Sequence, residues 1–213
     1  VENIVIPSEE TRIEMTPMDY EEFLWALGDK VTISMLKMAF ENKIPLGDDV
    51  NRRMMRDFRL YMLVGGMPQV VKEYIDTNNF NKVDQVKRSI LELYEDDFRK
   101  IDSTGKASLM FLAIPSELAK NTSRYQVSSV IPGEKQDRVL GIISEMKDSL
   151  TVNVAYHAND PSVGMSLHED ISKYKLFLSD TGLFTTLAFM DKDFTENIIY
   201  EKLLSDKLDT DLG

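Results

Sequence analysis

The chain has 213 residues, and its 36 Asp and Glu outnumber its 25 Lys and Arg to give a net charge of −11 at pH 7. With 43% hydrophobic and 29% charged residues, it has enough apolar side chains for a core and too many for a disordered chain. Cysteine is absent from the sequence, which excludes disulfide scaffolds, cysteine-ligated metal sites and thiol catalysis. There is neither a run of about 18 apolar residues nor a basic-then-apolar leader, so we expect a soluble cytoplasmic protein without a membrane partner. The acidic excess disfavours general binding to nucleic acids, which requires clustered Lys and Arg.

Residues 1–29 have the pattern of a short strand followed by a helix. Ile13 and Met15 alternate with polar residues, as in a brief strand. Thr16-Pro17 is suited to the first positions of a helix, and Gly28 is suited to its end. Such a unit buries little surface by itself, and the chain does not begin with methionine, so we expect a further domain to precede it.

Residues 30–105 are expected to form a compact helical subdomain. Apolar residues recur there at spacings of three and four, which is the pattern of amphipathic helices. The expected breaks are Pro45-Leu46-Gly47 and Gly65-Gly66-Met67-Pro68, because Gly and Pro interrupt helices. A long final helix follows, with Ile90 and Phe98 on its apolar face.

Residues 106–190 have the order of elements of a winged helix-turn-helix. The sequence predicts a helix, a short strand or turn, a second helix and a two-stranded hairpin, at residues 109–119, 125–130, 132–149, and 151–156 with 173–179. Residues 191–213 are expected to be a helical linker, with a helix over 195–208. The predicted fold is therefore mainly α, a helical bundle followed by a winged helix-turn-helix with a small β-hairpin.

The segment Thr104 to Ser108 resembles a phosphate-binding loop only superficially. A P-loop requires glycine five residues before Gly105, where Lys100 stands, and Ser or Thr after the lysine, where Ala107 stands. We interpret the segment as an ordinary loop that ends a helix.

Three other features favour structural interpretations over chemical ones. The acidic run at 95–97 places adjacent side chains in different directions on a helix, which is typical of a solvated face. His157 and His168 flank the expected wing loop and are more typical of solvated residues than of metal ligands. Trp25 lies among apolar helix residues, and we expect it to pack in the core or between domains.

The charge of the expected recognition helix tests whether the winged helix reads DNA. Between Glu134 and Asp148 the net charge is −1, and the wing loop is also acidic. This is a poor surface for phosphates, so a packing or protein-contacting winged helix is favoured over a DNA-binding one.

The most informative motif is the turn Gly65-Gly66-Met67-Pro68. Two glycines allow a sharp turn and close approach of another backbone, and Pro68 suits the first position of the next helix. By itself, this motif is equally compatible with a simple corner between two helices.

Five segments of the chain resemble, in order, segments of the prokaryotic AAA-type (AAA+ superfamily) ATPases that carry a C-terminal domain of unknown function. They are MTPMDYEEFL (15–24), YMLVGGMPQVV (61–71), ILELYEDDFRK (90–100), IPSELAKN (114–121) and YKLFLSDTGL (174–183). The resemblance covers nearly the whole chain. It is interrupted between Pro132 and Leu150, where the residues at both ends of the helix differ from the family pattern.

In that family an ATPase core leads into a helical lid, a winged helix and a nuclease-like tail. The resemblance therefore implies that 1–29 is the end of the ATPase core, 30–105 the helical lid, 106–190 the winged-helix domain and 191–213 a helical linker toward a further C-terminal domain. The P-loop and the acidic metal-binding strand would precede Val1. ATP and Mg²⁺ would be cofactors of the full-length protein, and neither is expected to bind tightly to this chain alone.

The resemblance also implies a nucleotide-binding role for five residues. In the wider group, a glycine-x-proline turn of the lid approaches the adenine, so Gly65, Gly66, Met67 and Pro68 would form one wall of the nucleotide site. Asp180 occupies the place of a residue that senses the phosphates in some of these proteins. No catalytic or metal-ligating residue is expected in this chain.

The expected function is to couple nucleotide state to domain arrangement, in a protein that is an ATPase only at full length. The expected partners are nucleotide, through the ATPase core, and a protein partner or a second copy. Two alternatives remain open at this stage. One is a winged-helix DNA-binding regulatory module, and the other is a protein-interaction scaffold that does not depend on nucleotide.

Overall fold

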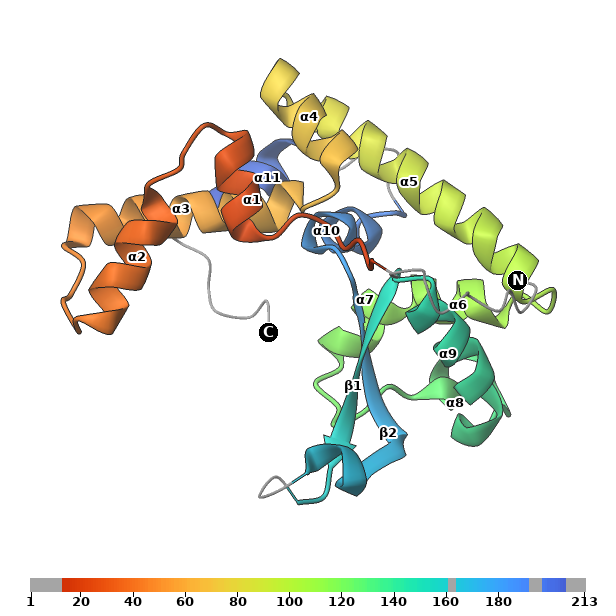
Figure 1. Ribbon diagram of the computed structural model, residues 1–213. Coiled ribbons are helices and arrows are strands. Elements are labelled where there is room, and N and C mark those ends of the chain that lie inside the picture. The colour runs from red at the N-terminus through yellow and green to blue at the C-terminus, as the bar shows by residue number, and fades with distance from the viewer. Residues whose placement is uncertain (1–12, 161–163, 192–196, 206–213) are drawn as a thin grey trace.

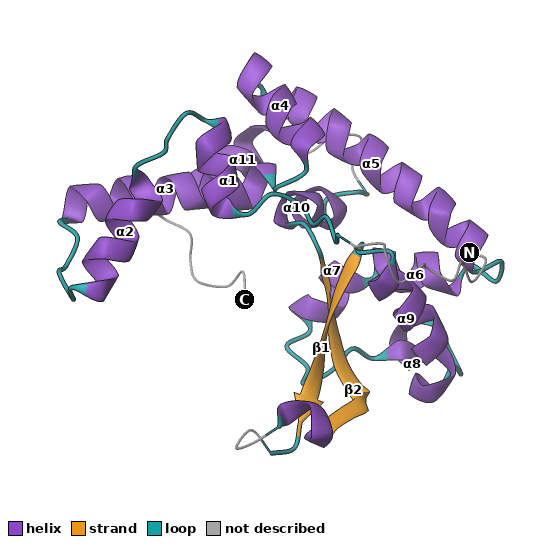
Figure 2. Cartoon of the chain, in the orientation of Figure 1, coloured by secondary structure: helices purple, strands orange, loops and turns teal. Residues whose placement is uncertain are grey.

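The computed structural model describes residues 13–160, 164–191 and 197–205. Over these residues the chain is mainly helical, with one small antiparallel sheet of two strands (Figure 2). The predicted fold class is therefore confirmed. None of the helices in these three ranges combines the length and the apolar character that a bilayer crossing requires.

Helix α1 (Tyr20–Ala26) begins later than the sequence suggested. Its N-terminal cap is Asp19, whose side chain accepts a hydrogen bond from the amide of Glu22 while the Glu22 side chain accepts one from the amide of Asp19. This reciprocal capping box satisfies two free amides at once, and a helix start at Thr16-Pro17 would lack it. The predicted strand around Ile13 and Met15 is also wrong, since residues 13–19 form no strand and both side chains are exposed.

Four helices occupy the predicted helical subdomain. They are α2 (Thr32–Glu41), α3 (Asp48–Val64), α4 (Pro68–Thr77) and α5 (Phe80–Ile101). The two predicted breaks fall between α2 and α3 and between α3 and α4. Figure 1 shows α5 along one side of the molecule, with α2 and the first part of α3 at the far end.

The helices between residues 106 and 149, where the sequence predicts a winged helix, are shorter than predicted. They are α6 (Lys106–Leu112), α7 (Ile114–Ala119), the single turn α8 (Val127–Val130), a 3₁₀ turn (Gln136–Val139) and α9 (Leu140–Asp148). A single helix over 109–119 is wrong because Pro115 has no amide to continue the hydrogen-bond ladder, so α7 starts afresh. The helix expected from Pro132 begins later because Gly133 has a φ of +79°, outside the helical region.

The hairpin pairs β1 (Val152–Ala158) with β2 (Glu169–Leu178) in antiparallel register, and a short 3₁₀ turn (Met165–His168) precedes β2. Val152 lies opposite Leu178, and Tyr156 lies opposite Tyr174. The predicted hairpin is confirmed, with strands that extend a few residues further toward the loop that connects them. Alternate residues of β2, among them Tyr174 and Leu176, are buried against the helices.

Helix α10 (Thr181–Ala188) follows the hairpin directly and lies at the centre of the molecule (Figure 1). It packs against α3 and α5, and α11 (Asn197–Leu204) packs against the same two helices. One continuous hydrophobic core runs from Phe23 through Phe98 to Leu187. The start and end of the predicted final helix, 195–208, lie outside the described residues.

Candidate functional site

The glycine turn between α3 and α4 is buried at its start and exposed at its end. Gly65 has a φ of +85°, a conformation that favours glycine. Gly65 and Gly66 are buried, Met67 is half-buried and Pro68 is exposed. Pro68 begins α4, as its fixed φ and missing amide predict.

The carboxylate of Asp180 lies directly beneath this turn. Its Oδ2 accepts a hydrogen bond from the amide of Gly66 at 2.6 Å, and its Oδ1 accepts one from the amide of Leu183 at 2.8 Å. A Cβ atom on Gly65 would lie 2.2 Å from Asp180 Oδ1, so the close contact requires glycine there. The structure thus brings together Gly65, Gly66 and Asp180, while their role in binding nucleotide stays a prediction.

Gly182 brings the start of α10 against the end of α3. A Cβ atom at this position would lie 2.2 Å from the carbonyl oxygen of Val64 and 2.6 Å from the amide nitrogen of Gly65. The two backbones are therefore in contact at Gly182, with no room for a side chain between them.

Lys87 of α5 completes the site and was not identified from the sequence. Its Nζ is fully buried and donates hydrogen bonds to the carbonyl oxygen of Leu63 at 3.0 Å, to that of Gly182 at 3.2 Å and to Tyr200 Oη at 3.0 Å. The helical spacing could have indicated that Lys87 is buried, because the apolar residues Val83 and Leu91 lie four positions to either side of it on the same face of α5. We call Gly65, Gly66, Lys87, Asp180 and Gly182 the junction.

Acidic groups surround the Lys87 ammonium. Asp84, also buried, accepts hydrogen bonds from Arg88 Nε at 2.8 Å, Thr186 Oγ1 at 2.9 Å and Tyr200 Oη at 3.2 Å. Burial lowers the pKa of Lys87 to about 8, although the charges of Asp84 and Asp180 act in the opposite direction. Burial likewise raises the pKa of Asp180 above its ordinary value, against the hydrogen bonds from the turn and from α10.

The segment before α1 covers the outer side of the turn. The amide of Met18 donates to the carbonyl oxygen of Gly66 at 2.8 Å, and Tyr61 Oη donates to the carbonyl oxygen of Met18 at 2.9 Å. A Cβ atom on Gly66 would lie 2.0 Å from that Met18 oxygen. Of the turn residues, only Met67 and Pro68 therefore reach the surface.

The hydrogen-bond partners of Lys87 and Asp180 are groups of the protein itself and belong to α3, α10, α11 and the turn. Such an arrangement can hold several elements in one relative position. The junction therefore joins α3, α5, α10 and α11 through buried hydrogen bonds.

The other motifs considered from the sequence have structural roles. Lys106 forms an ion pair with Glu134, and the acidic run at 95–97 pairs with Arg99 and Lys100 on the same helix. Within the three described ranges, no group of three or more His, Cys, Asp or Glu side chains is placed to hold a metal ion. The prediction that Trp25 packs in the core is wrong, because half of its surface is exposed.

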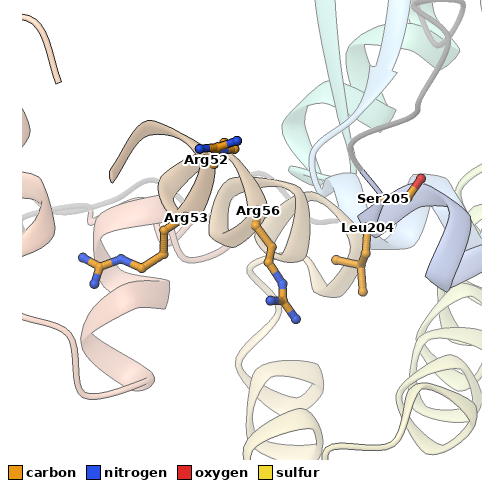
Figure 3. Close-up of a pocket in the computed structure, with 5 residues that line it drawn as sticks. All are labelled: Arg52, Arg53, Arg56, Leu204 and Ser205. Atoms are coloured by element: carbon orange, nitrogen blue, oxygen red, sulfur yellow. The ribbon is translucent and has the colours of Figure 1, made fainter. Parts of the chain in front are cut away.

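A surface hollow of about 410 Å³ lies elsewhere, and its lining residues are Arg52, Arg53 and Arg56 of α3 with Leu204 and Ser205 at the end of α11. Figure 3 shows that the three arginine side chains point in different directions. Arg52 also pairs with Asp49 at 2.8 Å. Because the guanidinium groups do not converge on one point, they do not define a site for a single anion.

Residues 55–193 match the model of a family described as a domain of unknown function, DUF8612. The match covers more than half of the chain, so the chain belongs to this family. The matched region contains the whole junction, whereas α1, α2 and α11 lie outside it. No curated protein and no solved structure matches the chain.

Proposed function

We propose that this chain is the lid and winged-helix portion of an AAA-type ATPase and couples the nucleotide state of that ATPase to the arrangement of its domains. Two features support the proposal. One is the five family-like segments, and the other is the order of a helical bundle followed by further helices and a β-hairpin. Nucleotide would reach the chain through the ATPase core, with ATP and Mg²⁺ as cofactors of the full-length protein in the cytoplasm.

The observation that carries the proposal is the hydrogen bond of 2.6 Å between the amide of Gly66 and Asp180 Oδ2. These residues lie 114 positions apart. The same carboxylate caps the start of α10 through the amide of Leu183, and α10 continues directly from β2. A shift of the turn therefore has to move α10 and the hairpin with it, or break a buried charge-assisted hydrogen bond.

A nucleotide beside the exposed end of the turn would contact Met67 and Pro68. If the nucleotide bound one conformation of the turn more tightly than another, it would shift the equilibrium toward that conformation. The size of the shift is set by the ratio of the two affinities. The 213 residues contain no P-loop motif, and the neutralisation of phosphate charge relies mainly on that loop, its lysine and the metal. We therefore expect no ATP hydrolysis by this chain alone.

Two experiments on the full-length protein test the proposal. The encoded sequence upstream of Val1 should contain a strand followed by G-x-x-x-x-G-K-[ST]. Hydrogen exchange measured with and without ATP and Mg²⁺ should then differ in peptides over 63–68 and 180–187, relative to α9. Equal exchange in both conditions would overturn the coupling and favour a scaffold that does not depend on nucleotide.

Asp180→Asn tests the coupling at a single residue. An asparagine oxygen cannot replace both carboxylate oxygens, so either Gly66 or Leu183 loses its acceptor. The ATP-dependent difference in exchange should shrink at 180–187 in this variant. Asp97→Asn is the matched control, because Asp97 is exposed and pairs only with Lys100 in the described part of the chain. A nucleotide response that survives Asp180→Asn unchanged would contradict the role of this contact.

A further inference from the structure

Tyr200 attaches the last described helix to the body of the protein. It lies on α11, outside the region that matches the family, yet its side chain is fully buried. Its ring stacks on Phe80 with the centroids 4.6 Å apart and an angle of 10° between the planes. Its hydroxyl donates to Asp84 Oδ1 at 3.2 Å and accepts from Lys87 Nζ at 3.0 Å. The aromatic ring and the hydroxyl are thus both held by α5.

Lys87 connects this attachment to the glycine turn. An ammonium group has three donors, and here they bind one acceptor each from α3, α10 and α11. The acceptor on α3 is Leu63, in the last turn of the helix, where carbonyl groups lack partners within the helix. The acceptor on α10 is Gly182, whose backbone touches Val64 and Gly65. Lys87 is therefore bound at the same time to the end of α3, the start of α10 and Tyr200.

We propose that α11 is a latch on the junction: docking of Tyr200 holds Lys87 in the position that secures the glycine turn, and release of α11 loosens the turn. The inference deepens the proposed function, on which its regulatory meaning rests. It names α11 as the element through which the C-terminal side of the protein and the turn influence each other. By linkage, a change at the turn would alter α11 docking by the same factor that α11 release alters the turn.

The physical reason is the cost of an unmatched donor in a buried site. When Tyr200 leaves, one N–H of a fully buried ammonium loses its acceptor, and Asp84 loses one of its donors. While it stays protonated, the ammonium regains a partner by admitting water or by moving away from Leu63 and Gly182. Either change weakens the contacts that hold the turn against α10.

Tyr200→Phe in the 213-residue chain tests the latch, with hydrogen exchange followed by mass spectrometry. Phenylalanine retains the ring stack on Phe80 and removes only the hydroxyl. Exchange should become about tenfold faster in α11 and in the peptide containing Gly66, relative to α9, which corresponds to loss of one hydrogen bond to a charged group.

Tyr74→Phe is the matched control. Tyr74 also packs on Phe80, at 5.6 Å, and its hydroxyl makes no hydrogen bond among the described residues.

The pattern of exchange decides the outcome. If Tyr200→Phe speeds exchange in α11 but not in the peptide containing Gly66, the latch is overturned. It is also overturned if Tyr74→Phe speeds exchange in both places as much as Tyr200→Phe does. If Tyr200→Phe does not fold, the unchanged protein in low concentrations of urea provides the test. The amides of α11 and of Gly66 should then open with the same urea dependence, as one cooperative unit, and different dependences would overturn the inference.

These measurements need no nucleotide, so they separate the latch from the proposed function. Coupled exchange in a protein that does not respond to ATP would retain the latch and refute the nucleotide role. Uncoupled exchange in a protein that responds to ATP would refute the latch alone.

Discussion

Gly182 illustrates how closely the elements approach at the junction. It belongs to α10, where glycine is normally unfavourable because it gains backbone freedom on unfolding. Here the absence of a Cβ atom lets α10 touch the carbonyl oxygen of Val64. The local cost of glycine is therefore offset by a backbone contact that joins α3 to α10.

Gly182→Ala should destabilise the protein by about 1–3 kcal/mol, because the added Cβ must displace backbone atoms. Gly141→Ala is the control. Gly141 also lies in a helix, α9, and a Cβ there would meet nothing within 4 Å. That variant should be more stable by roughly 0.5–1 kcal/mol. Urea denaturation of both variants provides the measurement, and equal effects would contradict the close approach at Gly182.

Lys87 should make the stability of the protein depend on pH in the alkaline range. Its pKa is about 8 in the folded protein, below the ordinary lysine value of 10.5 that the unfolded chain retains. Between these values the unfolded chain binds more protons at this residue than the folded one, so stability rises with pH. Below about pH 8 both states are protonated, and the unfavourable contribution is constant.

Lys87→Met removes this titration and provides the comparison. The free energy of unfolding of the unchanged protein, minus that of the variant, should increase as the pH is raised from 8 toward 10.5. Chemical denaturation at several pH values measures this difference. Two parallel curves would indicate that Lys87 titrates normally and is not buried as described.

At the scale of elements, the start or end of a helix could be predicted from the sequence where it is set by the residues at that point alone. The breaks at Pro45-Leu46-Gly47 and at Gly65 to Pro68 were predictable because Gly and Pro act through their own backbone. The start of α1 was not, because it depends on which of several polar residues finds a reciprocal partner, here Glu22.

The candidate site was predictable only in part. The glycine turn has a sequence signature, and Asp180 was identified through the family resemblance. Lys87 was missed because its partners Leu63, Gly182 and Tyr200 are distant in sequence, and two of them contribute backbone carbonyl groups that any residue type could supply. The partners of Lys87 become apparent only when α3, α10 and α11 are placed beside α5.

Helix α2 differs from the other long helices in how little it buries. Thr32 is its only buried residue, and Phe40 is 86% exposed. A helix of ten residues is marginal in water without tertiary packing. Its stability therefore depends on a few half-buried contacts, whereas α5 has buried side chains along much of its length.

Native-state hydrogen exchange should detect this difference. The amides of α2 should exchange through local opening and be largely insensitive to urea, while those of α5 should exchange only on global unfolding. Equal protection of both helices would contradict the prediction. It would indicate that α2 is covered in solution, and the molar mass from light scattering would then show whether a second copy covers it.

On the scale of the whole molecule, the core does not divide at the expected boundary after Gly105. Val64 and Phe98, which precede it, belong to the same hydrophobic cluster as Leu183 and Leu187, which follow it. Helix α10 supplies the latter two side chains to α3 and α5. The helical subdomain is therefore completed by a helix that the sequence assigned to the winged-helix region.

Separate production of residues 1–105 and 106–213 tests this interdependence. Each apolar side chain of α10 that loses its packing forfeits about 1.5–3 kcal/mol of burial energy, and typical domains are stable by only about 5–15 kcal/mol. Residues 1–105 alone should therefore lack a cooperative thermal transition in circular dichroism. Mixing the two pieces should restore one, because α10 again finds α3 and α5. A sharp transition in the isolated first piece, with the midpoint of the intact chain, would mean that the subdomain folds independently and that contact with α10 is not required to complete it.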